Sequence, residues 1–382
     1  MDKVSLINKF KYYFDTSECD QNDARCNNFN IIRIIAAFLV ILGHMYYIMG
    51  QEKNLSHFAG QPGIHTVGVK ILFVLCGYFV TKSWLSDAHP GRYAIKRLFR
   101  IYPALIVVIL LSVFVLGPIM TSLSAGEYFS NANAWRYLKN LILFPTYNLP
   151  GVFAKNAYEN TVNGSLWTIP VELAIYVLVP LLTLFPRKRK TPLIGAVLLA
   201  LCLALNICKA YLFPKTQIVV WGNDLLQAAD LLPEFFLGHI FSFVDKKYFN
   251  WRIGLITFLF ASRLVEIVIP EQLNDLFFPP ALAYFVLSFG NAERPVFRNW
   301  FKKSDFSYGL YLYGFPIQQI MYVLLKKANL HPLLMTFICF AIVLGFAILS
   351  WYFVEKPANK LCKKILSYIP KRKKENTAEQ AA

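Results

Sequence analysis

The stretch that decides the fold is residues 31–50, which read IIRIIAAFLVILGHMYYIMG. Arg33 is its only Lys, Arg, Asp or Glu, and about 20 mostly apolar residues is the length of a helix that crosses a bilayer. Comparable runs follow along the chain at 66–85, 101–122, 166–186, 192–213, 226–244, 251–269, 274–290, 305–326 and 333–354. The sequence therefore predicts an all-α membrane bundle of about ten transmembrane helices.

Composition supports this interpretation over a soluble one. Of the 382 residues, 56% are hydrophobic and only 16% are charged, whereas soluble domains have about 25% charged residues. These values exclude a secreted domain, a cytosolic enzyme and a disordered chain. The seven cysteines show no metal-ligand spacing, so we expect no metal site.

The distribution of basic residues predicts the orientation. With ten spans and cytoplasmic termini, Lys and Arg number 28 on the cytoplasmic side and 8 on the outer side, as the positive-inside rule requires. The net charge of +17 is thus a topology signal, and we expect no nucleic-acid partner. We predict a cytoplasmic arm without a signal peptide over 1–30, a membrane domain over 31–357 and a basic cytoplasmic tail over 358–382.

Two titratable residues share one face of the first span. Arg33 and His44 are eleven residues apart, which on a helix is three turns and about 16 Å along the axis. An arginine at the cytoplasmic mouth can hold an anion, and an imidazole deeper in the membrane can transfer protons. The alternatives are a snorkelling anchor for Arg33 and a hydrogen-bonded core histidine for His44.

Other costly charges lie near the predicted spans. Arg97 and Arg100 are three residues apart and project from one helix face, where two guanidiniums suit phosphate oxygens; the alternative is a cytoplasmic anchor. Glu172 lies inside a span and Glu355 at the end of the last one. A buried carboxylate needs a partner or a proton, so both are candidates for the site.

Taken in order, several motifs resemble those of the integral-membrane acyltransferase family 3, which includes bacterial cell-surface sugar O-acetyltransferases. The matching stretches are Arg33-x10-His44, Val67–Phe79, Arg97–Pro103, Ser165–Tyr176, Phe306–Leu312 and Phe353–Pro357. Among the departures, Asn30 stands where the family often has Asp, and Cys76 replaces a common Ser. The Arg, His and Glu positions are all kept.

The resemblance implies a mechanism and a location. An acetyl-CoA or other acyl-CoA docks from the cytoplasm, with its phosphates on Arg33, Arg97 and Arg100. His44 acts as general base on a sugar hydroxyl of an exported or surface glycan, or carries the acyl group transiently. Glu172 or Glu355 orients or charge-balances the imidazole or an arginine. The resemblance also implies a multi-pass protein of the bacterial inner membrane, embedded in the lipid bilayer.

Two other function classes fit parts of the sequence. A proton-coupled transporter or flippase without acyl chemistry also has many spans and buried Glu and His residues, but no internal repeat is visible here. The interpretation as a structural membrane scaffold does not explain why His44 and the arginines lie on one face. Transfer of acetyl groups from labelled acetyl-CoA separates these classes.

Overall fold

The structure is a computed structural model that describes residues 27–52, 61, 63–182, 191–292, 295–297 and 304–370. Residues 1–26, which make up most of the predicted N-terminal arm, lie outside the described residues. The same holds for 183–186, at the end of one predicted span, and for 371–382 at the end of the predicted tail.

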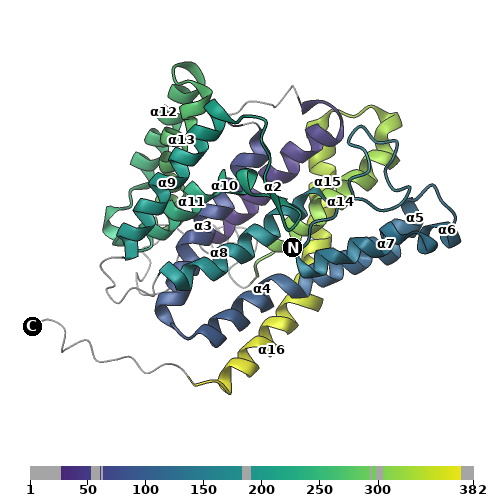
Figure 1. The fold of residues 1–382 in the computed structure, drawn as a ribbon, viewed down its shortest axis with the longest axis horizontal. Helices are drawn as coiled ribbons and strands as arrows, with labels where there is room; N and C mark the ends of the chain where they lie inside the picture. Colours follow the sequence, from purple (N-terminus) through teal and green to yellow (C-terminus); the bar gives the residue numbers. More distant parts are fainter. Residues whose placement is uncertain are drawn as a thin grey trace, which may run out of the picture.

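The described chain is a bundle of helices (Figure 1). Its longer helices are α2 (Phe29–Ile48), α3 (Ile64–Ser86), α4 (Pro90–Leu111), α8 (Thr168–Leu182), α9 (Thr191–Leu212), α11 (Leu232–Phe241), α12 (Trp251–Ile267), α13 (Asn274–Gly290), α14 (Ser307–Leu325), α15 (Pro332–Ser350) and α16 (Lys356–Ser367). Its shorter α-helices are α5 (Gly117–Met120), α6 (Ala125–Ser130), α7 (Ala132–Arg136) and α10 (Leu225–Ala229). The two strands, β1 (Val219–Val220) and β2 (Asn223–Asp224), pair antiparallel.

Short non-α segments connect or continue these helices. The 3₁₀ segments are η3 (Tyr137–Ile142), η4 (Gly164–Trp167), η5 (Lys246–Tyr248), η6 (Glu271–Leu273) and η7 (Lys326–Ala328). The π-helical segments are η2 (Ser112–Leu116), which follows α4, and η8 (Trp351–Glu355), which joins α15 to α16. π-Helical turns are frequent at functional sites, and η8 contains Glu355.

Six helical stretches in the described part of the chain are long and apolar enough to cross a membrane. They are Phe29–Ile48, Ile64–Ser86, Pro90–Met120, Gly164–Leu182, Thr191–Leu212 and Pro332–Ser367. These six support the prediction of a membrane protein. The other four predicted spans are less regular: 226–244 is divided between α10 and α11, α12 and α13 have 17 residues each, and α14 contains buried Gln318 and Gln319.

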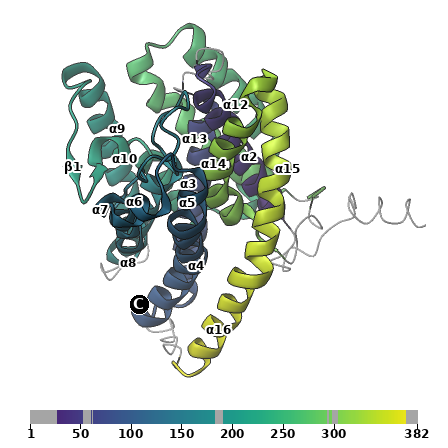
Figure 2. The same cartoon turned by 90° about the vertical axis from the view of Figure 1, so that its right-hand side faces the viewer.

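Two of the helices extend well beyond their apolar runs. The stretch Pro90–Met120 has 31 residues and Pro332–Ser367 has 36, which correspond to about 46 and 54 Å of helix, against roughly 30 Å of hydrocarbon. Figure 2 shows α4 and α16 projecting together past the other helices. The predicted span 101–122 thus belongs to a helix that begins three turns earlier, where the basic residues are.

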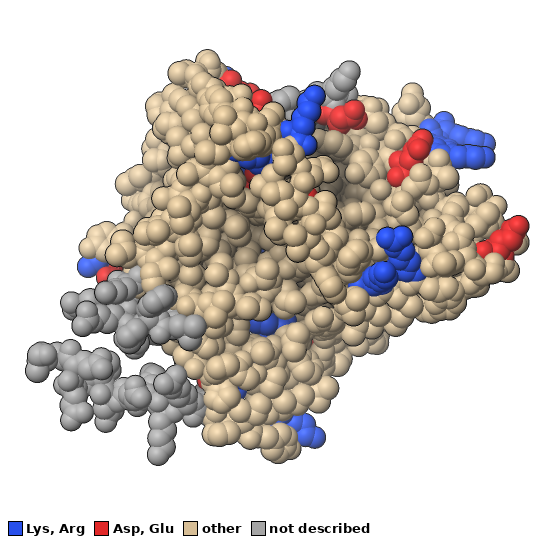
Figure 3. Space-filling model, in the orientation of Figure 1, with Lys and Arg blue, Asp and Glu red and all other residues tan. Residues whose placement is uncertain are grey.

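The outer surface of the bundle is largely apolar. On α9, Leu193, Val197, Leu201 and Leu205 are spaced four residues apart and are 64, 53, 60 and 45% exposed. Such a stripe faces lipid in a membrane-spanning helix. Figure 3 shows mostly uncharged side chains on this view, with Lys and Arg in a few separate groups.

Inside the bundle, glycines let helices approach closely. A Cβ atom on Gly77 of α3 would collide with the carbonyl oxygen of Phe235 on α11, and one on Gly238 of α11 would collide with that of Val74 on α3. Small residues at helix contacts are typical of membrane bundles. Within this region Lys70 of α3 forms salt bridges to Glu234 of α11 at 2.8 Å and Asp275 of α13 at 3.3 Å.

Candidate active site

A cavity of about 290 Å³ lies between α2, α3, α4, α8, α14 and α16. Its basic lining residues are Arg33, Lys96, Arg97 and Arg100, and the one acidic lining residue in the described part of the chain is Glu172. The sequence-predicted residues Arg33, Arg97, Arg100 and Glu172 thus come together from three helices. The cavity walls combine these charges with apolar and aromatic side chains, as in most ligand sites.

The arginines of α4 are placed by the way this helix begins. Pro90 occupies the first turn, where it loses no helical hydrogen bond, and the His89 ring accepts a hydrogen bond from the Arg92 backbone N–H at 3.3 Å. Because the helix starts here, Arg97 and Arg100 lie on its second and third turns, facing the cavity.

Arg33 and Arg97 are held by aromatic rings. The Arg33 guanidinium lies 4.8 Å from the centre of the Phe79 ring and donates a hydrogen bond to Asn30 Oδ1 at 3.0 Å. The Arg97 guanidinium lies 5.3 Å from the Tyr93 ring and 5.2 Å from the Tyr176 ring. Cation–π contacts position a cation without neutralising it.

Neither guanidinium has a carboxylate partner within 4.0 Å among the residues that the structure describes. Arg97 donates to Ser83 Oγ at 2.9 Å, and its Nε, which is buried, has no hydrogen-bond partner in the described part of the chain. A buried donor left unsatisfied is costly, so both groups are available to an anionic ligand.

Arg100 differs because it has two carboxylate neighbours. Its Nη2 lies 3.1 Å from Asp305 Oδ2 and its Nη1 lies 4.0 Å from Glu355 Oε2. Glu355 also accepts a hydrogen bond from Ser350 at 3.1 Å. The predicted residue Glu355 therefore contacts an arginine of the site from η8, while Asp305 was not predicted; its position just before α14, where it accepts the Ser307 N–H, is the signal that could have identified it.

Glu172 lines the cavity from α8 and accepts a hydrogen bond from the Tyr176 hydroxyl one turn later. Tyr93, in turn, donates to the backbone oxygen of Tyr176 at 2.9 Å. This network fixes α8 against α4. It also holds Tyr176 beneath the Arg97 guanidinium.

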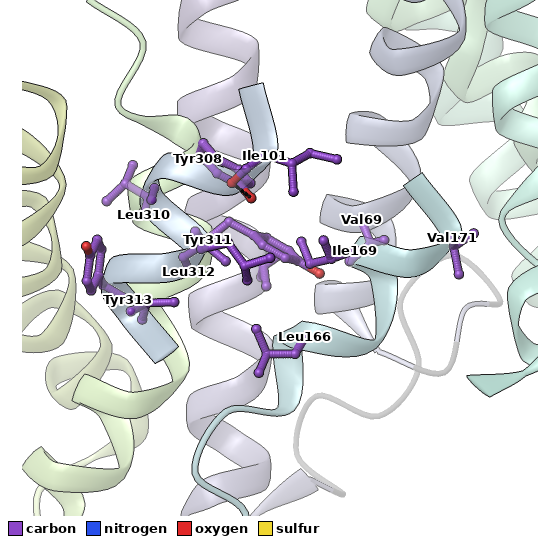
Figure 4. Close-up of a cluster of buried hydrophobic side chains, with 14 of the residues drawn as sticks. Val69, Ile101, Leu166, Ile169, Val171, Tyr308, Leu310, Tyr311, Leu312 and Tyr313 are labelled. Carbon is purple, nitrogen blue, oxygen red and sulfur yellow. Dashed lines mark hydrogen bonds between the residues drawn. The ribbon is translucent and has the colours of Figure 1, made fainter. Parts of the chain in front are cut away.

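The deeper wall is formed by α14 and the start of α8. Tyr308 donates to the backbone oxygen of Ile101 at 2.9 Å, and the Tyr311 hydroxyl forms a 2.6 Å hydrogen bond with Thr168 Oγ1. Figure 4 shows Tyr308 and Tyr311 on the side of α14 that faces Ile101 and Ile169. Both tyrosines belong to the motif Phe306–Leu312, but their role in the wall depends on packing between distant segments.

His44 does not line this cavity. It lies three turns along α2 from Arg33, with its ring centre 5.4 Å from that of His65 and 5.1 Å from that of Phe315. Phe315 is buried and lies one turn beyond Tyr311 on α14. The predicted site therefore has two parts on one face of α2: a basic cavity and an imidazole beyond it, with Phe315 packed against the imidazole.

One carboxylate near the cavity lies in the connection between two of the long helices. Asp87, between α3 and α4, accepts hydrogen bonds from Lys96 at 2.7 Å and from Arg92 at 2.9 Å. Burial opposes ionisation of Asp87, but these hydrogen bonds and charges outweigh it and hold the pKa of the carboxyl below its usual value. Lys96 is therefore fixed at the cavity edge by a carboxylate.

Comparison with known proteins gives one family. The acyltransferase domain, family 3, matches residues 27–352. An O-acetyl transferase of Shigella phage Sf6 is 26% identical over 342 residues, which cover 87% of this chain and 96% of the relative. Nodulation protein 10 of Rhizobium leguminosarum bv. viciae is 25% identical over 357 residues, covering 88% and 94%. No solved structure matches the chain.

Proposed function

Because the chain belongs to acyltransferase family 3, we propose that it is a membrane O-acyltransferase that moves an acetyl or other short acyl group from an acyl-CoA to a sugar hydroxyl. The acceptor is a glycan or lipid-linked sugar on its way to the cell surface. The donor binds from the cytoplasmic side of the bacterial inner membrane, and His44 carries out the proton transfer. No metal takes part in this scheme.

The observation that supports this proposal most strongly is the pair of guanidiniums without carboxylate partners in the described cavity. Arg33 and Arg97 are partly buried and line a cavity of about 290 Å³. Burying unpaired cations is unfavourable unless a ligand neutralises them. Phosphate oxygens of coenzyme A suit them, because a planar guanidinium donates two parallel hydrogen bonds to such an anion.

The length of the site suits a thioester donor. Coenzyme A is a polyanionic nucleotide with a long, uncharged pantetheine arm that ends in the thioester. Beyond the arginines the cavity is lined by Val69, Phe73 and Ile169, which suit that arm. Arg33 and His44 are about 16 Å apart along α2, so phosphates at one end leave the thioester near the other.

The reaction at His44 needs a base that removes the hydroxyl proton and a proton donor for the leaving thiolate. The imidazole takes the proton of the acceptor hydroxyl while its oxygen attacks the thioester carbonyl carbon. The carbon–sulfur bond then breaks, an ester forms, and the imidazolium returns its proton to the leaving thiolate. The products are the acylated sugar and free coenzyme A.

The acceptor approaches from the opposite end. Tyr158, in the connection that follows η3, lies 5.9 Å from the Phe315 ring between centres and is 40% exposed. An exposed ring that packs on Phe315, which in turn packs on His44, suits the apolar face of a sugar. The phage relative is called an O-acetyl transferase, which supports an oxygen as the acyl acceptor.

The two glutamates have separate tasks in this proposal. Glu355 balances the charge of Arg100 at the donor end, where the two side chains are 4.0 Å apart. Glu172 lies among the arginines and accepts the Tyr176 hydroxyl, so it orients the aromatic floor beneath Arg97. Neither contacts His44 in the described structure.

The proposal is tested with purified protein in proteoliposomes and labelled acetyl-CoA. Wild type should transfer acetyl to an added glycan acceptor or release it to water. His44→Ala should lose transfer by about 10²- to 10⁴-fold, the usual contribution of a general base. The same variant should still bind acetyl-CoA, because the arginine cavity is unchanged.

Two results would contradict the proposal. Transfer at the wild-type rate by His44→Ala would remove the imidazole from the chemistry. Wild-type protein that moves a lipid-linked sugar across the vesicle membrane without using acetyl-CoA would instead favour a flippase.

A further inference from the structure

Helix α16 covers the end of the cavity that carries Lys96 and Arg97. It is continuous with α15 through η8, and its residue Asn359 lines the cavity. One face of α16 is apolar, with Cys362 buried. Four exposed lysines, Lys356, Lys360, Lys363 and Lys364, lie around the rest of the helix.

Arg92 of α4 fixes this helix in place. Its Nη1 donates hydrogen bonds to the backbone oxygens of Leu366 and Ile369 at the end of α16, and its Nε donates to Asp87 at 2.9 Å. The last carbonyls of a helix have no partner within the helix. A single buried arginine therefore ties the end of α16 to the start of α4.

Lys96 and Arg97 of α4 line the cavity together with Asn359 of α16. Lys363 is four residues after Asn359, which turns it only about 40° around the helix, whereas Lys364 is turned about 140° away. Of the four lysines of α16, Lys363 therefore has the direction closest to that of Asn359, which lines the cavity.

We propose that α16 completes the donor site by binding the phosphates at the nucleotide end of acyl-CoA. This inference rests on the function proposed above. Lys363 and Lys96 contact phosphate oxygens at the cavity mouth, and the Asn359 amide donates to the same group, while Arg33 and Arg97 act deeper. The family match ends at residue 352, so α16 adds to the site from beyond the matched domain.

The test compares two donors that share the thioester and differ in the nucleotide: acetyl-CoA and S-acetylpantetheine. Lys363→Gln should raise the KM for acetyl-CoA about three- to tenfold, as expected for one partly exposed charge-assisted hydrogen bond. It should leave the KM for S-acetylpantetheine unchanged, because that donor has no phosphate. Lys364→Gln, on the other side of the helix, should change neither value.

Each other outcome counts against the assignment. An equal rise for both donors would mean that α16 acts through the fold, and no rise for either would remove it from the site. Weaker binding to vesicles containing anionic lipid, with unchanged KM, would show that the lysines bind lipid headgroups. If wild type used neither thioester, the proposed function would fail first, and the role of α16 with it.

Discussion

Replacing Arg97 and replacing Arg100 should have different consequences, although both arginines line one cavity. Arg97 has a single side-chain hydrogen bond in the described structure, to Ser83, and no carboxylate partner there. Arg97→Gln therefore leaves no buried anion behind. The variant should fold as well as wild type and lose only its contact with the donor.

The size of that loss follows from the chemistry. A hydrogen bond to a charged group contributes about 1.5–3 kcal/mol, and 1.4 kcal/mol is a factor of ten in binding. Arg97→Gln should thus raise the KM for acetyl-CoA by roughly 10- to 150-fold. Its melting temperature in detergent should match that of wild type.

Arg100→Gln removes the cation that Asp305 and Glu355 share, at 3.1 and 4.0 Å. Breaking a fully buried pair costs about 3–5 kcal/mol, but Arg100 and Asp305 are 33 and 25% exposed. We therefore expect a loss of about 1–2 kcal/mol of stability after solvent screening. This variant should melt at a lower temperature as well as bind the donor less well.

Acetyl-CoA kinetics and thermal unfolding of the same preparations measure both effects. Arg252→Gln is the matched control. Arg252 is exposed and is not a lining residue of the cavity, and its guanidinium lies 5.8 Å from the centre of the Trp251 ring. An unchanged KM in Arg97→Gln would refute the donor role of Arg97. Equal destabilisation by Arg97→Gln and Arg100→Gln would refute the distinction between free and paired arginines.

Three further changes test the contact between α3 and α11, the Asp87 carboxylate at the cavity edge, and the Phe315 ring beside His44. Gly77→Val should cost at least about 1–3 kcal/mol of stability from overpacking, because its side chain meets the backbone of α11; thermal unfolding measures this loss. Because the pKa of Asp87 is lowered in the folded protein, its stabilising effect is full above about pH 4 and lost as pH falls through the lowered value. Asp87→Asn should therefore melt at a lower temperature than wild type at pH 7, and the difference should shrink below pH 4. Phe315→Ala should open the region beside His44 to water, so that acetyl-CoA hydrolysis increases relative to transfer.

Each of these three changes has a result that would contradict it, and Gly77→Val has a matched glycine control. Gly345→Ala places its new methyl group where no atom lies within 4 Å, so it should not destabilise. A Gly77→Val protein that melts with wild type would contradict the close helix contact. A constant difference between Asp87→Asn and wild type from pH 7 to pH 3 would contradict the lowered pKa. An unchanged ratio of hydrolysis to transfer in Phe315→Ala would show that this ring does not exclude water.

Apolar runs predicted the helices that are bounded by polar or glycine-rich segments. The first two spans, 31–50 and 66–85, differ from α2 and α3 by two residues or fewer at each end. The third helix begins eleven residues before the predicted span 101–122, because hydropathy reports the solvent around a helix and not its hydrogen bonds. Residues 226–244 were read as one span, although the helix is interrupted between Ala229 and Leu232.

The sequence predicted which charged residues lie together in the site. It did not predict that His44 lies outside the cavity that those residues line. Arg33, Arg97, Arg100 and Glu172 do line one cavity, as their motifs suggested. His44 does not line that cavity; it packs against Phe315, a residue 271 positions further along the chain. No local pattern reports such a contact, and the same is true of Asn359, which lines the cavity from α16.

The salt bridge between Lys70 and Glu234 has a consequence for how the chain is made. Lys70 enters the membrane with α3, where a lysine costs about 2.5–3.5 kcal/mol near the centre of a span. Its partner is encoded 164 residues later, which takes about 10–30 s of synthesis at usual rates. α11, with ten residues and about 15 Å of length, is too short to insert alone. Before α11 and α13 dock, Lys70 lacks both of its carboxylate partners, Glu234 and Asp275, so we expect release of α3 from the insertion machinery to be timed by the arrival of these helices.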